Sequence, residues 1–390
     1  KCKEVKEESY CHDCKERTIP YYICPGCGAE SLEPKCKRCN KEAVGFNKRS
    51  IDLGKLVSEA SQRLGVKVPD IVKGVKGTIN QQKIAEPLEK GILRAKYDLH
   101  VFRDATIRYE IINAPLTHFK PVEIGTSIEK LHEMGYTKDV EGKELENVNQ
   151  LVEILPQDIV IHDEAGDFFV IVTKFIDDLL EKYYGLEKIF RINTREELVG
   201  ELLLGLAPHT SAAIVGRVVG YTKARACFAH PYFHQTKRRN IDGDQDSLML
   251  LMDGLLNFSH SYLPASRGGR MDAPLVFTVA LKPTEIDDEC YNMETCNEYP
   301  LELYERALKL APPEIDGIET VNSRLGKKNQ YSGFGITHKT SCFDCAPTTS
   351  KYVELNSMEE KIKGQAKLQN MIAAVDGKDA LERVMVTHFM

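Results

Sequence analysis

The stretch LVEILPQDIVIHDEAGDFFVIVTKF, residues 151–175, places β-branched and aromatic runs on both sides of the acidic segment 163–166. Such runs are typical of strands joined by a turn, so strands are predicted here, with a helix following at 176–185. Short strands and helices mixed without a regular βαβ alternation indicate an α+β fold. Outward from this stretch, helices are predicted at 51–65, 128–136 and 195–206, and strands at 96–102, 106–113 and 274–281.

The composition is that of an ordinary globular protein. Of 390 residues, 28% are charged and 42% are hydrophobic, and the net charge of −6 excludes a basic field over the whole surface. No apolar run approaches the roughly 20 residues that span a bilayer. Because the chain begins at Lys1 rather than at Met, we expect a fragment of a longer protein.

Cysteines are concentrated near the N-terminus. Seven of the twelve lie in the first 39 residues, six of them as three C-x-x-C pairs, which favours a metal site in a reducing cytosol over disulfides. Zinc prefers four thiolates in a tetrahedron, and an all-thiolate site leaves no open position for catalysis. We therefore predict one or two structural zinc ions, with the ligands Cys11, Cys14, Cys24, Cys27, Cys36 and Cys39.

The grouping of these pairs stays open at the sequence level. The first two pairs are neighbours in sequence and would share an ion, which leaves the third pair to complete a second site with Cys2. The other grouping fits the spacing equally well. The remaining cysteines, among them Cys342 and Cys345, are interpreted as structural or free thiols.

An acidic loop follows a basic segment in KRRNIDGDQD, residues 237–246. Asp242, Asp244 and Asp246 alternate, so their side chains would point the same way in an extended segment. At about 4 Å and an effective dielectric constant of about 20, each pair of carboxylates repels by roughly 4 kcal/mol. A divalent ion such as Mg²⁺ removes this repulsion. We call residues 240–246 the aspartate loop and predict a magnesium site there.

Simpler interpretations of the aspartate loop exist. A solvated acidic turn is the usual structure of a D-G-D sequence. An EF-hand is disfavoured, because Ser247 stands where the calcium loop needs glycine. The apolar run that follows predicts a buried helix starting at Asp246, which would then be the N-cap of that helix.

Basic segments lie before and after the aspartate loop. HPYFHQTKRR, residues 230–239, precedes it and RGGRMDAP, residues 267–274, follows it. Carboxylates that hold metal, among cations that hold phosphates, describe a phosphoryl-transfer site. Packed histidines and a solvated basic surface are the alternative. The predicted nucleic-acid or phosphate contacts are Lys73, Lys76, His209, Lys237, Arg238, Arg239 and Arg267.

Three long blocks carry a family resemblance, namely KGVKGTINQQKIAEPLEKG from Lys73, GLAPHTSAAIVGRVVGYTKARACFAHPYFHQTKRRNIDGDQDS from Gly205 and RGGRMDAPLVFTVAL from Arg267. Together with the rest of the chain they resemble the large, catalytic subunit of archaeal family D DNA polymerase. The resemblance implies a double-psi β-barrel core similar to that of multisubunit RNA polymerases. It also implies that Asp242 and Asp244 bind the catalytic metal ions, with Asp246 as a weaker candidate.

The function implied by this resemblance is template-directed DNA synthesis, in which two Mg²⁺ ions serve nucleotidyl transfer to a primer 3′-hydroxyl. The implied partners are a DNA primer–template, dNTPs, a small proofreading exonuclease subunit and the sliding clamp. The implied location is the cytoplasm, at the nucleoid, with no membrane involved. The alternatives are another metal-dependent nuclease or RNA-synthesising relative, and a zinc-stabilised DNA-binding fragment without activity.

The resemblance also divides the chain. The family's large subunit extends beyond both ends, so we expect a C-terminal-half fragment that lacks part of the active-site cleft. THKTSCFDCAP, residues 337–347, departs from the family's more acidic sequence. The predicted domains are a zinc-ribbon module at 1–46, a barrel or accessory α+β region at 47–205, a catalytic barrel with the aspartate loop at 206–300 and a mainly helical region at 301–390.

Overall fold

The computed structural model describes residues 22–45, 51–76, 85–239, 241, 243–264, 266–311, 318–335, 342 and 351–389. The chain divides into two compact units, residues 1–59 and residues 60–390. The first unit contains the antiparallel strands β1 (Tyr22–Ile23) and β2 (Glu30–Ser31). Helix α1 (Leu53–Leu64) spans the division and confirms the helix predicted at 51–65. The predicted domain boundaries stay predictions.

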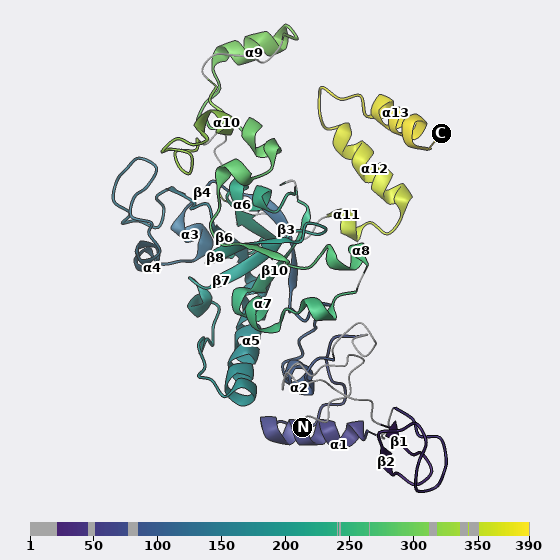
Figure 1. Ribbon diagram of the computed structural model, residues 1–390. Coiled ribbons are helices and arrows are strands. Elements are labelled where there is room, and N and C mark those ends of the chain that lie inside the picture. The colour runs from purple at the N-terminus through teal and green to yellow at the C-terminus, as the bar shows by residue number, and fades with distance from the viewer. Residues whose placement is uncertain are drawn as a thin grey trace. The chain divides into compact units, whose positions relative to one another are not determined.

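A closed six-stranded barrel is the centre of the second unit (Figure 1). Its strands pair in the order β8-β6-β9-β3-β10-β7, and β7 pairs again with β8 to close the sheet. Parallel and antiparallel pairs are mixed, which confirms the α+β class. The strands are β3 (Tyr109–Pro115), β6 (Asp158–His162), β7 (Leu202–Leu206), β8 (Ala212–Thr222), β9 (Ala226–Ala229) and β10 (Gln245–Leu250).

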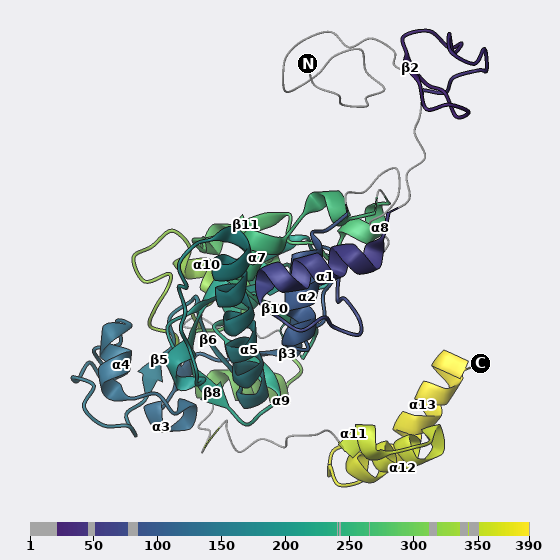
Figure 2. The same ribbon diagram turned by 90° about the horizontal axis from the view of Figure 1, so that it is seen from below.

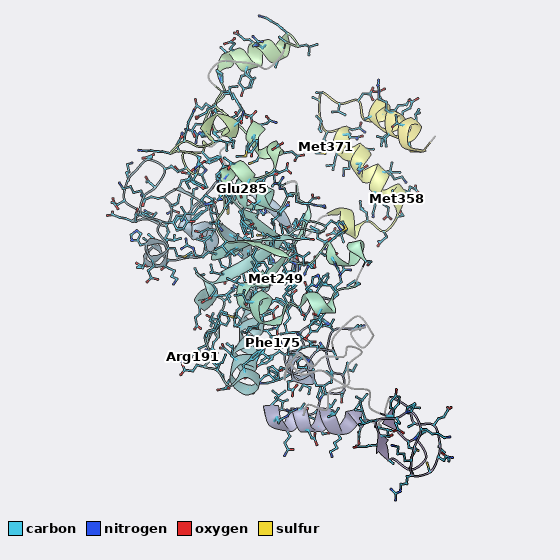
Figure 3. The ribbon with its side chains drawn as sticks, viewed as in Figure 1. Phe175, Arg191, Met249, Glu285, Met358 and Met371 are labelled. Atoms are coloured by element: carbon cyan, nitrogen blue, oxygen red, sulfur yellow. The ribbon has the colours of Figure 1, made fainter. Side chains whose placement is uncertain are left out.

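The barrel interior is filled by aliphatic side chains and by one aromatic ring. Leu204, Val215 and Met249 belong to one buried cluster, and Figure 3 labels Met249 at the centre of the molecule. Helix α6 (Pro231–Thr236) packs the ring of Phe233 against the backbone of Gly216, where an added Cβ would lie 2.8 Å from the ring. The close approach of α6 to the sheet therefore requires a glycine at that position.

The strands and turn predicted at 151–175 are only partly correct. Residues 158–162 form β6, but the acidic segment starts α5 (Asp163–Leu179), which lies beside the barrel strands (Figures 1 and 2). The His162 side chain caps this helix by accepting a hydrogen bond from Glu164 N at 3.2 Å. Acidic residues in the first turn favour a helix start. The buried positions 165, 169, 172 and 176 recur at helical spacing.

Two other predicted helices are wrong because leucine-rich segments pair as barrel strands. The segment 195–206 holds only a 3₁₀ turn (Glu196–Leu198) before β7, whose Leu203, Leu204 and Leu206 are buried between β8 and β10. The helix predicted to begin at Asp246 is β10 followed by α7 (Leu251–Asn257), so Asp246 is not an N-cap. Strands buried on both faces give continuous apolar runs that do not distinguish strand from helix.

The remaining predictions have mixed outcomes. The strand predicted at 96–102 is wrong, because α2 (Leu88–Lys96) ends there, whereas the strand predicted at 106–113 is β3 with shifted bounds. The helix at 128–136 and the strand at 274–281 are confirmed in shorter form as α4 (Ile128–Glu133) and β11 (Val276–Thr278). The segment 176–185 is the end of α5 and a π-helix.

The other elements are short or lie towards the C-terminus. The short ones are β4 (His118–Phe119), β5 (Val152–Glu153), α3 (Pro121–Ile124), α8 (Arg267–Arg270), the π-helix Leu180–Tyr184 and the 3₁₀ turns His260–Tyr262, Pro283–Glu285 and Asp288–Asn292. Within the described residues after 300, the regular elements are helices, as predicted: α9 (Leu301–Leu308), α10 (Val321–Arg324), α11 (Lys351–Glu354), α12 (Met358–Gln369) and α13 (Gly377–Phe389).

Candidate functional site

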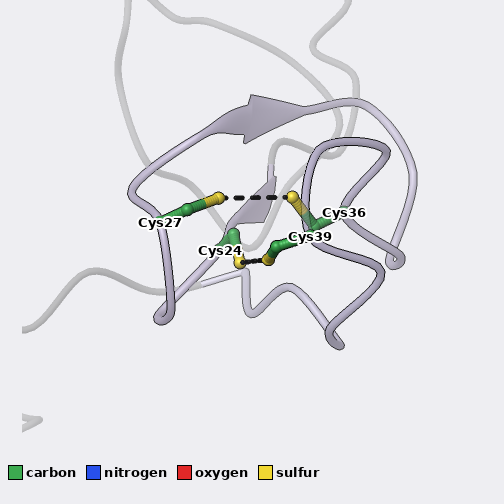
Figure 4. Close-up of side chains that lie close together, drawn as sticks. All are labelled: Cys24, Cys27, Cys36 and Cys39. Atoms are coloured by element: carbon green, nitrogen blue, oxygen red, sulfur yellow. Dashed lines mark hydrogen bonds between the residues drawn. The ribbon is translucent and has the colours of Figure 1, made fainter.

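Four cysteines converge in the first unit (Figure 4). The Sγ atoms of Cys24 and Cys39 lie 3.2 Å apart, those of Cys27 and Cys36 lie 3.6 Å apart, and all four lie within 4.8 Å of one another. Tetrahedral zinc with Zn–S bonds of about 2.3 Å places its sulfur ligands about 3.8 Å apart. The donor set therefore fits one zinc ion.

Two similar turns present these four thiols. In each turn the first cysteine carbonyl accepts a 2.9 Å hydrogen bond from the residue after the second cysteine, namely Gly28 and Asn40. Both of these residues have a positive φ, +71° and +62° respectively, which glycine and asparagine tolerate best. The sequence thus supplies, after each C-x-x-C, the residue that the tight turn needs.

The structure groups the second and third cysteine pairs, rather than the first and second. Cys24 and Cys27 share their site with Cys36 and Cys39, so the grouping of the first two pairs is not the one observed. The first pair, Cys11 and Cys14, lies outside the described residues. Within the described ranges this is the one cluster of metal-binding side chains.

The aspartate loop connects helix α6 to strand β10 in the second unit. β10 runs antiparallel between β3 and β7, so the loop lies where β3 and β7 end. Gly243 has φ +97°, a conformation that bends the backbone and that side chains rarely permit. Asn113 on β3 holds this bend: its Oδ1 accepts from Gly243 N at 3.1 Å, and its backbone N donates to Asp244 O at 2.9 Å.

The predicted acidic residues have different surroundings. Asp242 lies outside the described residues. Asp244 is partly exposed, with 33% of its side-chain surface accessible, and its Oδ2 lies 2.9 Å from Arg239 Nε. Asp246 is completely buried. Asp244 and Asp246 thus each have their own cationic partner, Arg239 and Lys237 respectively.

Asp246 ends a buried chain of polar contacts. Its Oδ2 accepts a hydrogen bond from Lys237 Nζ, and Lys237 also lies 3.1 Å from His234 Nδ1. His234 Nε2 lies 3.0 Å from the carbonyl oxygen of Ala114 on β3. These partners fix the directions: neutral His234 donates through Nε2 to Ala114, and its Nδ1 accepts from the Lys237 ammonium.

Burial and neighbouring charges keep these hydrogen-bonded side chains in one protonation state. Burial and the neighbouring Lys237 charge lower the pKa of His234, so its imidazole stays neutral. Burial, the largest single influence, would raise the pKa of Asp246, but the Lys237 charge and the interactions with His234 together outweigh burial and lower that pKa below its usual value. The pair is thus an ion pair around neutrality, and it holds the first residues of β10 against α6.

This arrangement gives Asp246 and Lys237 structural positions. Lys237 was predicted to contact phosphate, but its side chain is fully buried and bound to Asp246. Asp246 was predicted as a catalytic acid; its side chain is fully buried, Oδ2 accepts from that lysine, and Oδ1 has no hydrogen-bond partner among the described residues. A buried pair of this kind stabilises only when both partners are present.

The other predicted basic residues are dispersed. Lys73 forms an ion pair with Asp98, and Arg238 donates to Glu285 O at 3.2 Å. His209, with φ +66°, is held by Asp272 through its backbone N at 2.9 Å. Lys76 is exposed, and nothing is described of the Arg267 side chain. Among the described residues, only Arg239 of this set forms an ion pair with Asp244.

The part of the site that could bind Mg²⁺ is the Asp244 carboxylate. Its oxygens are the hard, anionic donors that Mg²⁺ prefers, and the exposed side chain leaves room for water or phosphate ligands. The guanidinium of Arg239 lies beside the Asp244 carboxylate, which shows that this carboxylate accepts a cationic partner. The donor chemistry therefore fits a magnesium ligand, whereas the buried Asp246 does not offer an open position.

One residue that supports this site was missed from the sequence. Asn113 was not considered at all, although YEIINAP places a polar Asn in an otherwise alternating strand, whereas for His234 the alternative of a packed histidine is the one observed. Burial alternates at Ile111, Ile112 and Asn113, so Asn113 faces inward. A polar residue at an inward position of a strand is the signal that could have found it.

Searched over its described residues, the structure contains no helix both long enough and apolar enough to cross a membrane.

Comparison with known proteins gives the family. Residues 65–361 match the family described as DNA polymerase II large subunit DP2, catalytic domain. The DNA polymerase II large subunit of Methanothermobacter thermautotrophicus is 49% identical over 371 residues, which cover 94% of this chain and 34% of that protein. That of Pyrococcus furiosus is 48% identical over 399 residues, which cover 100% of this chain and 32% of that protein.

The chain thus spans about a third of the length of these curated relatives. The expected relationship to a polymerase large subunit is confirmed at the level of these names. Because the family match covers most of the chain, the protein belongs to the DNA polymerase II large subunit DP2 catalytic-domain family.

Proposed function

We propose that this chain carries the nucleotidyl-transfer centre of an archaeal family D replicative DNA polymerase, and that its closed barrel is of the double-psi type. The observation that carries the proposal is the Asp244 carboxylate, which is partly exposed on a bent loop at the end of a central barrel strand. The names of the relatives support it, because they are DNA polymerase large subunits.

Asp242 and Asp244 are the residues that would hold two Mg²⁺ ions. When bound, the ions would favour deprotonation of the primer 3′-hydroxyl and stabilise the negative charge on the leaving pyrophosphate. The chain's own residues supply the frame for this chemistry. Gly243 provides the bend, Asn113 holds it, and Arg239 places a cation beside Asp244 where the triphosphate also needs one.

The partners follow from the same resemblance. A DNA primer–template and dNTPs are the substrates, and the small proofreading exonuclease subunit and the sliding clamp complete the polymerase. Their contacts would involve the rest of the full-length subunit as well as this chain. Action on DNA places the protein in the cytoplasm, at the nucleoid.

Substitution of Asp244 tests the proposal. In the full-length subunit with its small partner, Asp244→Asn should reduce primer extension by roughly 10³-fold, about 4 kcal/mol of transition-state stabilisation. Zinc content and melting temperature should stay at wild-type values, because the side chain is partly exposed and outside the core. Extension at the wild-type rate would refute the assignment.

A matched control is Asp379→Asn, which removes an exposed aspartate that also pairs with an arginine Nε, here Arg383 at 2.8 Å. It should leave extension unchanged. Parallel reactions with dNTPs, with NTPs and without nucleotides distinguish DNA synthesis from RNA synthesis and from nuclease activity. DNA binding without any Mg²⁺-dependent turnover would instead support a non-catalytic scaffold.

A further inference from the structure

We propose that Asn113 is a positioning residue that fixes the Gly243–Asp244 peptide, and through it the Asp244 carboxylate, for metal binding. This inference rests on the proposed function. Asn113 makes contacts on both sides of this peptide, because its side chain receives Gly243 N–H and its main chain donates to Asp244 O. Within the described part of the chain, Asn113 is the residue that bonds to both Gly243 and Asp244.

The position of Asn113 in the barrel makes it a rigid support. Its side chain is 1% exposed. β3 pairs with β9 on one side, where Asn113 is opposite Cys227, and with β10 on the other side, where Ile112 is opposite Gln245. A strand paired on both sides cannot move without the barrel, so the bend of the loop is held by a rigid part of the fold.

The loop itself needs such a support. An added Cβ at Gly243 would meet no atom within 4 Å, so the bend is not maintained by side-chain packing. Glycine at φ +97° also has more backbone freedom than any other residue would have there. A hydrogen bond to a fixed acceptor therefore limits the motion of the peptide that carries Asp244.

The contact acts on metal binding more than on stability. Gly243 is exposed and water can replace Asn113 as its acceptor, so loss of the bond costs little folding free energy. A magnesium ligand must instead be held close to ideal octahedral geometry. A loop that samples several bends holds its ligand correctly for only a fraction of the time, and the apparent affinity for metal falls by that fraction.

The test compares Asn113→Ala with Asn257→Ala in the full-length protein with its partner subunit. Asn257 is the matched control, because it is also a buried asparagine, 2% exposed, but its amide donates to Asp253 in α7. For Asn113→Ala we expect the half-activating Mg²⁺ concentration and the dissociation constant for Mn²⁺, measured by electron paramagnetic resonance, to rise about tenfold. Hydrogen exchange in the peptide that contains Gly243 should become faster.

Asn257→Ala should lower the melting temperature and leave both metal constants unchanged. A second variant, Gly243→Ala, strains the bend from the loop side without touching the barrel core, so it should fold and show the same metal phenotype. Because both variants act on one contact, their effects in the double variant should be less than additive.

Unchanged metal constants in both Asn113→Ala and Gly243→Ala would overturn the inference, as would equal shifts in Asn113→Ala and the Asn257→Ala control. These outcomes are separate from a failure of the proposed function. If Asp244→Asn is inactive but Asn113→Ala binds metal normally, only the role of Asn113 is lost. If Asp244→Asn is fully active, the proposed function itself is lost.

Discussion

Lys237 and Asp246 show that one charged sequence motif can contain both buried and accessible charges. Both side chains are fully buried. Lys237 follows His234 by three residues and Asp246 follows Lys237 by nine, and the two opposite charges form an ion pair. Asp244 and Arg239 form a partly exposed pair, and among the described residues of this segment Arg238 is exposed as well. The mixture of acids and bases in residues 237–246 therefore separates into a buried supporting pair and a partly exposed pair.

Removing one member of the buried pair should destabilise the protein strongly. Asp246→Asn or Lys237→Met leaves an uncompensated buried group, with an expected loss of about 3–5 kcal/mol in the free energy of unfolding measured with denaturant. The double variant Lys237→Met/Asp246→Leu should recover much of this loss and retain primer extension. An inactive double variant with wild-type stability would instead indicate that Asp246 binds metal.

At the scale of elements, α7 is tied to the segment before β3 by a buried carboxylate. Asp253 Oδ2 accepts from Ile107 N at 2.7 Å and Oδ1 accepts from Asn257 Nδ2 at 2.8 Å. Burial raises the pKa of Asp253 from 3.8 to about 6, and the two hydrogen bonds only partly oppose that rise. Folding therefore favours the protonated form of Asp253.

This shift gives a pH dependence with a definite sign. Between about pH 3.8 and 6 the folded state binds the Asp253 proton more tightly than the unfolded state, so the contribution of Asp253 to stability falls as pH rises and is constant above that range. We expect the difference in unfolding free energy, wild type minus Asp253→Asn, to increase as pH is lowered from 7 to 4.5. A difference independent of pH would contradict the raised pKa.

Helices and turns whose own residues carry a recognisable pattern could be predicted from the sequence. Strands that depend on pairing with residues far away in the sequence could not. α1 and α4 have helical spacing on an otherwise polar background, and the turn residues Gly28 and Asn40 follow their cysteines directly. β7 and β10 are apolar enough to be helices, and only their neighbours in the closed sheet make them strands. The start of α5 did have a local signal, since an acidic first turn follows a capping histidine, and that signal was misread as a turn.

The candidate site likewise has parts that could be predicted from the sequence and parts that could not. The residue types predict carboxylate chemistry at Asp244 because D-G-D is contiguous in the sequence. Burial of Lys237, and support by Asn113 and His234, depend on strands and a helix brought together by barrel closure. The spacing of residues within the loop does not predict which of its charged side chains will be buried.

At the scale of the whole molecule, the chain combines a unit whose four cysteines can hold a metal ion with a unit built around a barrel. The described part of the first unit has a small buried cluster of Cys24, Cys36 and Ala43. So small a core cannot stabilise a fold, and structural zinc typically supplies about 10–16 kcal/mol at pH 7 in small zinc domains. The barrel has its own buried hydrophobic cluster, which includes Leu204, Val215 and Met249.

Loss of one zinc ligand should therefore affect one unit only. Cys24→Ser should lower bound zinc by one equivalent per chain, measured by atomic emission, and make residues 22–45 sensitive to protease. The main unfolding transition of the barrel should keep its midpoint. Cys296→Ser, which replaces a cysteine outside the cluster, is the control and should retain full zinc content. Loss of the barrel transition in Cys24→Ser would show that the two units are interdependent.

The hydrogen bond between Gly243 and Asn113 joins positions 130 residues apart in the chain. Because synthesis runs from the N-terminus, β3 is made before the acidic motif, which leads into β10, the last of the six barrel strands in the sequence. On the proposed function, we therefore expect competence to bind metal at Asp244 only when the ring of strands has closed. Formation of the candidate site and completion of the barrel would then be the same event.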